Sequence, residues 1–226
     1  MRGIVLECGT NLPPLPAVEA RVARVPERPG KAAVDPILAE ASELDDGAGA
    51  DLIVVGSDAD LAAVVLRLLR TDRLAGTSVG FVPAGRRSQV AMLWRLPIDP
   101  ARALALASRG EGSQVPLIRD DKGGVLLGCA TIGPVRGEAY CDDTRAFRGL
   151  ARRIAVTPDN TGGQGVVARV STGRWVRRTT TLAGRAFQLG CEPAAPTIDG
   201  VPQPREANRW TWYRHTEDLW LVHGPR

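Results

Sequence analysis

The sequence is poor in histidine and has no closely spaced cysteines, and these are the usual ligands of zinc. Its only histidines are His215 and His223. Its four cysteines are scattered along the chain, and no two of them form a C-x-x-C pair. This spacing gives neither a zinc-ligand set nor a disulfide framework. We therefore expect free, buried thiols and no metal site.

Long hydrophobic runs are also missing. No apolar stretch approaches the roughly 20 residues that a helix needs to span a bilayer. The start of the chain, MRGIVLECGT, carries one positive charge and an apolar core too short for a secretory signal, so we expect a first strand there. These features predict a cytoplasmic protein whose contact with membranes is at most peripheral.

Basic residues are in slight excess, and the excess lies in the second half of the chain. The net charge is +4, and the segments 148–153 (RGLARR) and 174–178 (RWVRR) are strongly basic. Such a bias suits an anionic partner, such as a phosphate, an acidic lipid or nucleic acid. Solvated faces of β-strands are the simpler explanation.

The first half of the chain alternates short apolar runs with helical patterns. The runs at 3–8, 51–56 and 78–83 are continuously apolar, which is typical of strands covered on both faces. Strands that alternate with helices predict a mostly parallel sheet between two layers of helices. We therefore expect a three-layer α/β domain of the nucleotide-binding kind over residues 1–112.

Helical patterns lie at 35–46, 60–70 and 99–110. The first pattern opens with an Asp-Pro pair, which favours Asp35 as the N-cap and Pro36 as the first helical residue. The third opens with the same pair of residues. The second places its leucines and valines on one stripe, as an amphipathic helix requires.

From residue 113 onward the helical patterns stop. Short strand-like runs are separated by Gly, Pro, Asn and Asp. Only 142–153 is long enough for a helix, and it fits a loop equally well. Evenly spaced short strands predict a second domain over 113–226, an antiparallel β-sandwich or open barrel. The tryptophan-rich end, 209–224, is expected to form its last hairpin.

Three segments follow one another in an order that is found in a known family. They are DLIVVGSDADLAAVV (51–65), VGFVPAGRRSQVAMLWRLPIDPARALALA (79–107) and PTIDGVP (196–202). This order resembles the diacylglycerol kinase catalytic domain family, with its bacterial lipid-kinase relatives. That family has a strand ending in G-G-D-G-T, then a strand ending in P-x-G-T-x-N-D-x-A-R, and D-G-E near the end of its β-sandwich.

The resemblance implies a fold, cofactors and site residues. In the family, the first two loops are expected to hold the phosphates and ribose of ATP, with magnesium held by acidic groups. Asp58 and Asp199 lie at the matching catalytic positions. The matching nucleotide-binding positions are Gly56, Ser57, Ala59, Asp60, Ala84, Gly85, Arg86 and Arg87.

Departures from the family pattern argue against catalysis. Ser57 and Ala59 replace glycines, so side chains narrow the approach of the backbone to a phosphate. Asp60 replaces a threonine and puts a negative charge where a triphosphate would bind, and its carboxylate is expected to accept N–H groups at the helix start. Val201 replaces the glutamate, and a valine cannot act as a general base.

Further departures lie in the second loop, where Arg86, Ser88 and Gln89 stand in place of Thr, Asn and Asp. The sequence thus predicts a lipid-kinase-like protein that is catalytically impaired but retains binding of a nucleotide, a phosphate or a lipid. ATP and magnesium, the cofactors of the family, fit these altered loops poorly.

Two alternatives stay open at this point. An active ATP-dependent lipid kinase with a rearranged site would need Asp58 or Asp199 for metal and base duties. A non-enzymatic scaffold or anionic-membrane adaptor would use the basic β domain. The expected partner is a nucleotide or an anionic lipid, nucleic acid is not expected, and homo-oligomer formation is left open.

Overall fold

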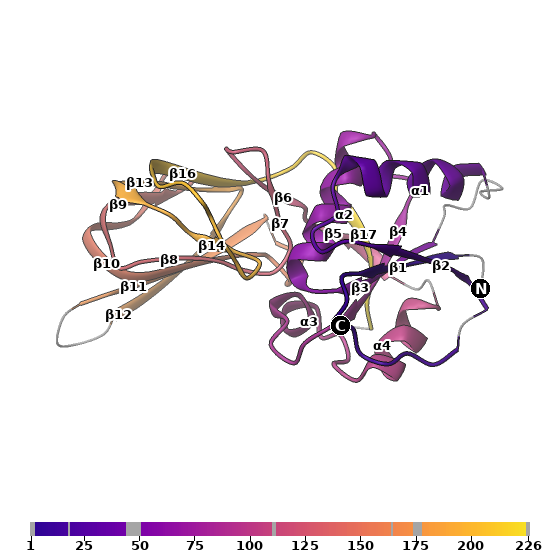
Figure 1. Cartoon of the computed structure of the whole chain (residues 1–226). Coiled ribbons are helices and arrows are strands. Elements are labelled where there is room, and N and C mark those ends of the chain that lie inside the picture. Colours follow the sequence, from indigo (N-terminus) through magenta and orange to yellow (C-terminus); the bar gives the residue numbers. More distant parts are fainter. Residues whose placement is uncertain are drawn as a thin grey trace. The chain divides into compact units, whose positions relative to one another are not determined.

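The computed structural model divides the chain into two compact units. One comprises Met1–Val115 with Glu217–Arg226, and the other comprises Pro116–Thr216. Figure 1 shows both units. The structure describes residues 3–17, 19–43, 51–109, 112–163, 165–173 and 178–224.

The first unit is built around a six-stranded sheet with the strand order β2-β1-β3-β4-β17-β5. All neighbouring strands are parallel except β17 and β5. The strands predicted at 3–8, 51–56 and 78–83 are confirmed, and so is the mostly parallel sheet. The strands are β1 (Gly3–Cys8), β2 (Arg21–Val25), β3 (Asp51–Gly56), β4 (Ser78–Pro83), β5 (Gly112–Val115) and β17 (Leu219–Val222).

Helices cover both faces of this sheet, as the three-layer prediction requires. They are α1 (Lys31–Glu43), α2 (Asp58–Arg70), α3 (Gln89–Trp94) and α4 (Pro100–Ala107). Figure 1 shows α1 and α2 on one side of the sheet and α4 on the other. Ala103, Leu104 and Ala107 of α4 pack in one core cluster with Ile53 and Val55 of β3. The buried stripe of α2 consists of Leu61, Val64, Val65 and Leu68.

The predicted start of α1 is wrong. The helix begins at Lys31, and the C=O of Gly30 accepts the N–H groups of Ala33 and Val34. Asp35 therefore lies inside the helix, where it accepts two hydrogen bonds of 2.8 Å from Arg67 of α2. These bonds lower the pKa of Asp35 below its usual value. The other Asp-Pro pair behaves as predicted, because Asp99 caps α4 by accepting the N–H of Arg102.

The second unit is an eleven-stranded antiparallel sheet, which confirms the predicted all-β domain. Trp210 and Trp212 share one face, are stacked with centroids 6.2 Å apart, and are 2% and 0% exposed. The strands are β6 (Ile118–Asp120), β7 (Val125–Leu126), β8 (Ala130–Ile132), β9 (Val135–Cys141), β10 (Thr144–Pro158), β11 (Val166–Thr172), β12 (Arg178–Gly184), β13 (Ala186–Ala194), β14 (Thr197–Ile198), β15 (Val201–Pro202) and β16 (Ala207–Arg214).

Two local expectations for the second half differ from the structure. The segment 142–153 is neither helix nor loop but mostly part of β10, whose Phe147 and Ala151 face the core. The last run does not form a hairpin with β16, because β17 pairs with β4 and β5 in the parallel sheet. Most of the basic segment 174–178 lies outside the described residues. No helix among the described residues is long and apolar enough to cross a bilayer.

Candidate functional site

The turn from β3 to α2 holds the first candidate loop. Ser57 is the N-cap of α2, and its hydroxyl oxygen accepts the N–H of Asp60 at 3.3 Å. In return, the carboxylate of Asp60 accepts the N–H and the hydroxyl of Ser57, each at 2.7 Å. This reciprocal pairing is a capping box. The expected bond from a backbone N–H to Asp60 is present, but the predicted helix start is wrong, because the helix begins at Asp58 and its N-cap is Ser57.

Asp60 also binds a segment that the sequence analysis missed. Its second carboxylate oxygen accepts the N–H of Arg28 at 2.6 Å. Arg28 lies between β2 and α1 and has a left-handed backbone (φ 48°). Asp60 is only 3% exposed, and a Cβ on Gly56 would lie 2.7 Å from its carboxylate. Gly56 is therefore needed here to make room for the chain's own carboxylate.

The Cys8 thiol at the end of β1 lies in the electrostatic field of the same loop. Burial raises its pKa to about 12, and the negative charge of Asp60 adds to the shift. The thiol therefore stays protonated at neutral pH and does not provide a thiolate nucleophile or metal ligand. This supports the expectation that the cysteine is a buried structural residue.

Asp58 joins the first loop to the second. It is 8% exposed, and its carboxylate accepts the Ser88 hydroxyl, the Gln89 N–H at 2.6 Å and the Val90 N–H at 3.3 Å. Ser88 in turn is the N-cap of α3 and accepts the N–H of Ala91. Asp58 and Ser88 together therefore occupy the N–H groups of the first turn of α3.

Burial raises the pKa of Asp58 above the ordinary value, although its three hydrogen bonds act in the opposite direction. The two loops also meet through their backbones, because the N–H of Ala84 donates to the C=O of Gly56 at 2.7 Å. The structure thus brings together most of the predicted nucleotide-binding residues, but their polar groups largely bind one another.

The tip of the second loop is different. Gly85, Arg86 and Arg87 are exposed. Within the part of the chain that the structure describes, neither guanidinium group has a hydrogen-bond acceptor or a salt-bridge partner. A Cβ on Gly85 would meet no atom within 4 Å. Two cations beside an open backbone are suited to binding an anion. Ala59, by contrast, is a half-buried residue in the first turn of α2.

Asp199 belongs to the second unit and organises a turn there. It is 4% exposed and accepts the N–H groups of Leu127, Gly128 and Cys129 at 2.8–3.0 Å. Asp199 and Gly200 have φ values of 46° and 83°, and they connect β14 to β15. An Asp-Gly pair with positive φ at both positions is the preferred two-residue hairpin turn. This role requires no catalytic duty.

The carboxylates of Asp58, Asp60 and Asp199 are poorly suited to bind a magnesium ion. Asp58, Asp60 and Asp199 each accept three hydrogen bonds from N–H or O–H groups of the chain. Magnesium needs carboxylate oxygens that are open toward the ion and its waters. Over the described residues, no group of three or more His, Cys, Asp or Glu side chains is arranged to hold a metal.

Comparison with known proteins places this geometry in a fold. No family model matches the chain, and no curated protein matches it. Among solved structures, a diacylglycerol kinase from Bacillus anthracis is similar, with a TM-score of 0.69 and 11% identity over 99% of this chain and 97% of that chain. This chain has the diacylglycerol-kinase-like fold. The resemblance seen in the three motifs is thereby confirmed at the level of the fold.

Two further solved structures have a similar fold. An NAD kinase from Archaeoglobus fulgidus in complex with ATP has a TM-score of 0.57 and 10% identity, over 97% of this chain and 93% of that one. A yeast NADH kinase complexed with NADH has a TM-score of 0.53 and 9% identity, over 91% and 75%.

The raised pKa of Asp58 predicts how an Asp58→Asn variant responds to pH. The folded protein holds this proton more tightly than the unfolded chain does. The tighter binding of the proton stabilises the folded wild-type protein fully at a pH below the ordinary aspartate pKa of 3.8. This stabilisation is lost as the pH rises through the pKa that Asp58 has in the folded protein. Asparagine does not ionise. The free energy of unfolding of the variant should therefore rise relative to wild type as the pH increases above about 4, as urea titrations at a series of pH values would measure.

A matched control is Asp72→Asn, an exposed position with a left-handed backbone that asparagine tolerates. Its stability relative to wild type should not change with pH in the same way. An equal pH dependence of the two variants would contradict the assigned environment of Asp58.

Proposed function

We propose that this chain is a lipid-kinase-like protein that is impaired in phosphoryl transfer and binds an anionic ligand at the exposed tip Gly85–Arg87. The observation that carries the proposal is the occupation of both loops by the chain's own carboxylates. Asp60 binds Ser57 and Arg28, and Asp58 binds the start of α3. The N–H groups of Ser57, Gln89 and Val90 and the carboxylates of Asp58 and Asp60 are thus paired within the chain.

Impairment follows from the charges that phosphoryl transfer requires. Catalysis of this reaction relies on positioning and on neutralising the charge that spreads over the γ-phosphate. The carboxylate of Asp60 lies at the N-terminus of α2, where it stabilises the helix dipole but repels an approaching phosphate. Val201, which stands at the start of β15, provides no proton acceptor in place of the family's glutamate.

The proposed binding of an anion depends on Arg86 and Arg87. Their guanidinium groups can each donate paired hydrogen bonds to a phosphate, and Gly85 leaves space beside them. Two neighbours in the fold are described as complexes with ATP and with NADH, which supports a nucleotide as the first ligand to test before an anionic lipid. We also propose the cytoplasm as the location of the chain, as the sequence predicts.

The direct test of impairment is transfer of labelled phosphate from ATP with magnesium to diacylglycerol or a sphingoid base. We expect no turnover above a protein-free control. Robust turnover would contradict the proposal and favour an active kinase with a rearranged site. In that case, an Asp58→Ala variant with undiminished turnover would further show that the active site does not use this carboxylate.

Restoring the residues of the kinase family in the first loop should increase the affinity for ATP without restoring phosphoryl transfer. The triple change Ser57→Gly, Ala59→Gly and Asp60→Thr removes the buried negative charge and opens the backbone. Calorimetry should show ATP binding about tenfold tighter or more than in wild type, since such a charge contributes at least about 1.4 kcal/mol. Stability should fall by on the order of 1 kcal/mol for the lost Asp60 carboxylate and by a similar amount for glycine at position 59 within the helix, whereas glycine at the N-cap position 57 costs about a few tenths of a kcal/mol.

The control adds Arg86→Gln and Arg87→Gln to the triple variant, which should remove the gained affinity. Phosphoryl transfer should remain absent, because Ser88 and Val201 still depart from the kinase pattern. If the wild-type protein already binds ATP as tightly as the triple variant does, Asp60 is no barrier and the proposed occupation of the loop by the chain itself is wrong.

A further inference from the structure

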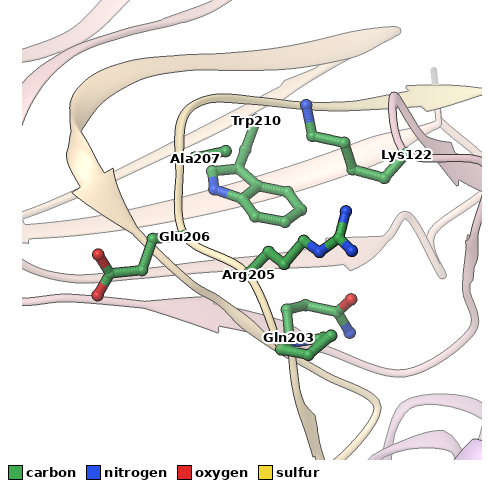
Figure 2. Close-up of a pocket in the computed structure, with 7 residues that line it drawn as sticks. Lys122, Gln203, Arg205, Glu206, Ala207 and Trp210 are labelled. Atoms are coloured by element: carbon green, nitrogen blue, oxygen red, sulfur yellow. The ribbon is translucent and has the colours of Figure 1, made fainter.

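A pocket of about 350 Å³ lies within the second unit, between the β6–β7 turn and the segment that connects β15 to β16. Figure 2 shows its lining. This volume is at the lower end of the roughly 300–1,000 Å³ that is typical of small-molecule sites. Its apolar wall is formed by Trp210, Pro204 and Ala207, and its polar and charged side chains are those of Lys122, Gln203, Arg205 and Glu206.

The walls of the pocket are held in place by hydrogen bonds. On one side, Asp120 accepts the N–H of Lys122 at 2.8 Å and of Gly124 at 2.9 Å, which fixes the β6–β7 turn. On the other side, the indole Nε1 of Trp210 donates to the C=O of Ala194 at 2.9 Å. The N–H of Gln203 donates to the C=O of Pro196 at 2.8 Å. A ligand would therefore meet a largely pre-formed site.

Two cationic side chains, Lys122 and Arg205, and one carboxylate, Glu206, line the pocket. The ammonium of Lys122 lies 5.4 Å from the centroid of the Trp210 ring and 3.3 Å from a carboxylate oxygen of Asp121, so its charge is partly neutralised. Arg205 is exposed, and its guanidinium has no ion-pair partner among the residues that the structure describes. Figure 2 shows the carboxylate of Glu206 directed away from Arg205 and Lys122.

We propose that this pocket binds a small amphiphilic carboxylate. The carboxylate accepts paired hydrogen bonds from the Arg205 guanidinium, while Lys122 adds a weaker attraction. The apolar body packs mainly on Pro204 and Ala207, because the nearly buried Trp210 exposes little of its ring. A monoanion matches Arg205, the one cation of the lining without an ion-pair partner among the described residues. The second negative charge of a phosphate dianion would face only Lys122, whose charge is already partly neutralised. The site uses no residue of the β3–α2 and β4–α3 loops, so it stands apart from the function proposed above.

Octanoate is the probe, and ligand-observed NMR or calorimetry with the full chain is the measurement. We expect octanoate to bind at millimolar concentrations, with octanol and octyl phosphate each binding more weakly. Arg205→Gln should weaken octanoate binding about tenfold, as loss of a paired charged hydrogen bond does. The matched control is Arg209→Gln, which removes an exposed arginine of β16 that does not line the pocket.

A second variant, Ala207→Leu, fills the apolar end and should reduce octanoate binding with the charge left unchanged. Absence of octanoate binding to wild type would overturn the proposal. So would equal affinity in Arg205→Gln and wild type, or tighter binding of octyl phosphate than of octanoate. Arg86→Gln should leave octanoate binding unchanged, so failure of this proposal and failure of ATP binding can be told apart.

Discussion

Buried aspartates hold the backbone N–H groups of loops throughout this protein, and both units depend on this interaction. The buried members are Asp58, Asp60, Asp120, Asp159 and Asp199. Each accepts at least one backbone N–H of a turn or a helix start. A buried N–H without an acceptor would cost about 1–3 kcal/mol, so each carboxylate stabilises the loop that it binds. The charge on the carboxylate strengthens these bonds.

This interaction underlies the proposal that a chain with a kinase-like fold is impaired in the chemistry of a kinase. In a phosphate-binding loop, N–H groups at a helix start are turned toward the ligand. Here the N–H of Ser57 donates to Asp60 at the start of α2, and the N–H groups of Gln89 and Val90 donate to Asp58 at the start of α3, so a carboxylate of the protein lies at each helix start. These bonds connect the two loops to the chain without a ligand, and the exposed arginines of the second loop are the proposed contact for an anion.

Local patterns were sufficient to predict much of the fold. The buried strands β1, β3 and β4, the stripe of α2 and the Asp99 cap are encoded by neighbouring residues, and the order of motifs located both loops. Contacts between distant segments were not predictable in this way. The Asp-Pro pair at position 35 suggests a helix cap, because nothing in the neighbouring sequence reveals that the partner of Asp35 is Arg67, 32 residues away. The bond from Arg28 to Asp60 and the return of β17 to the first sheet also depend on tertiary packing. The proposed partners and homo-oligomer formation stay predictions.

Amide hydrogen exchange at three positions tests the central claim most directly. If the loops are occupied by the chain's own carboxylates, the N–H groups of Arg28, Ser57 and Gln89 exchange slowly in the ligand-free protein, because each donates to a buried aspartate. Addition of ATP and magnesium should leave their protection unchanged. Fast exchange at all three amides without ligand, followed by protection when ATP and magnesium are added, would contradict the account and indicate an open nucleotide site.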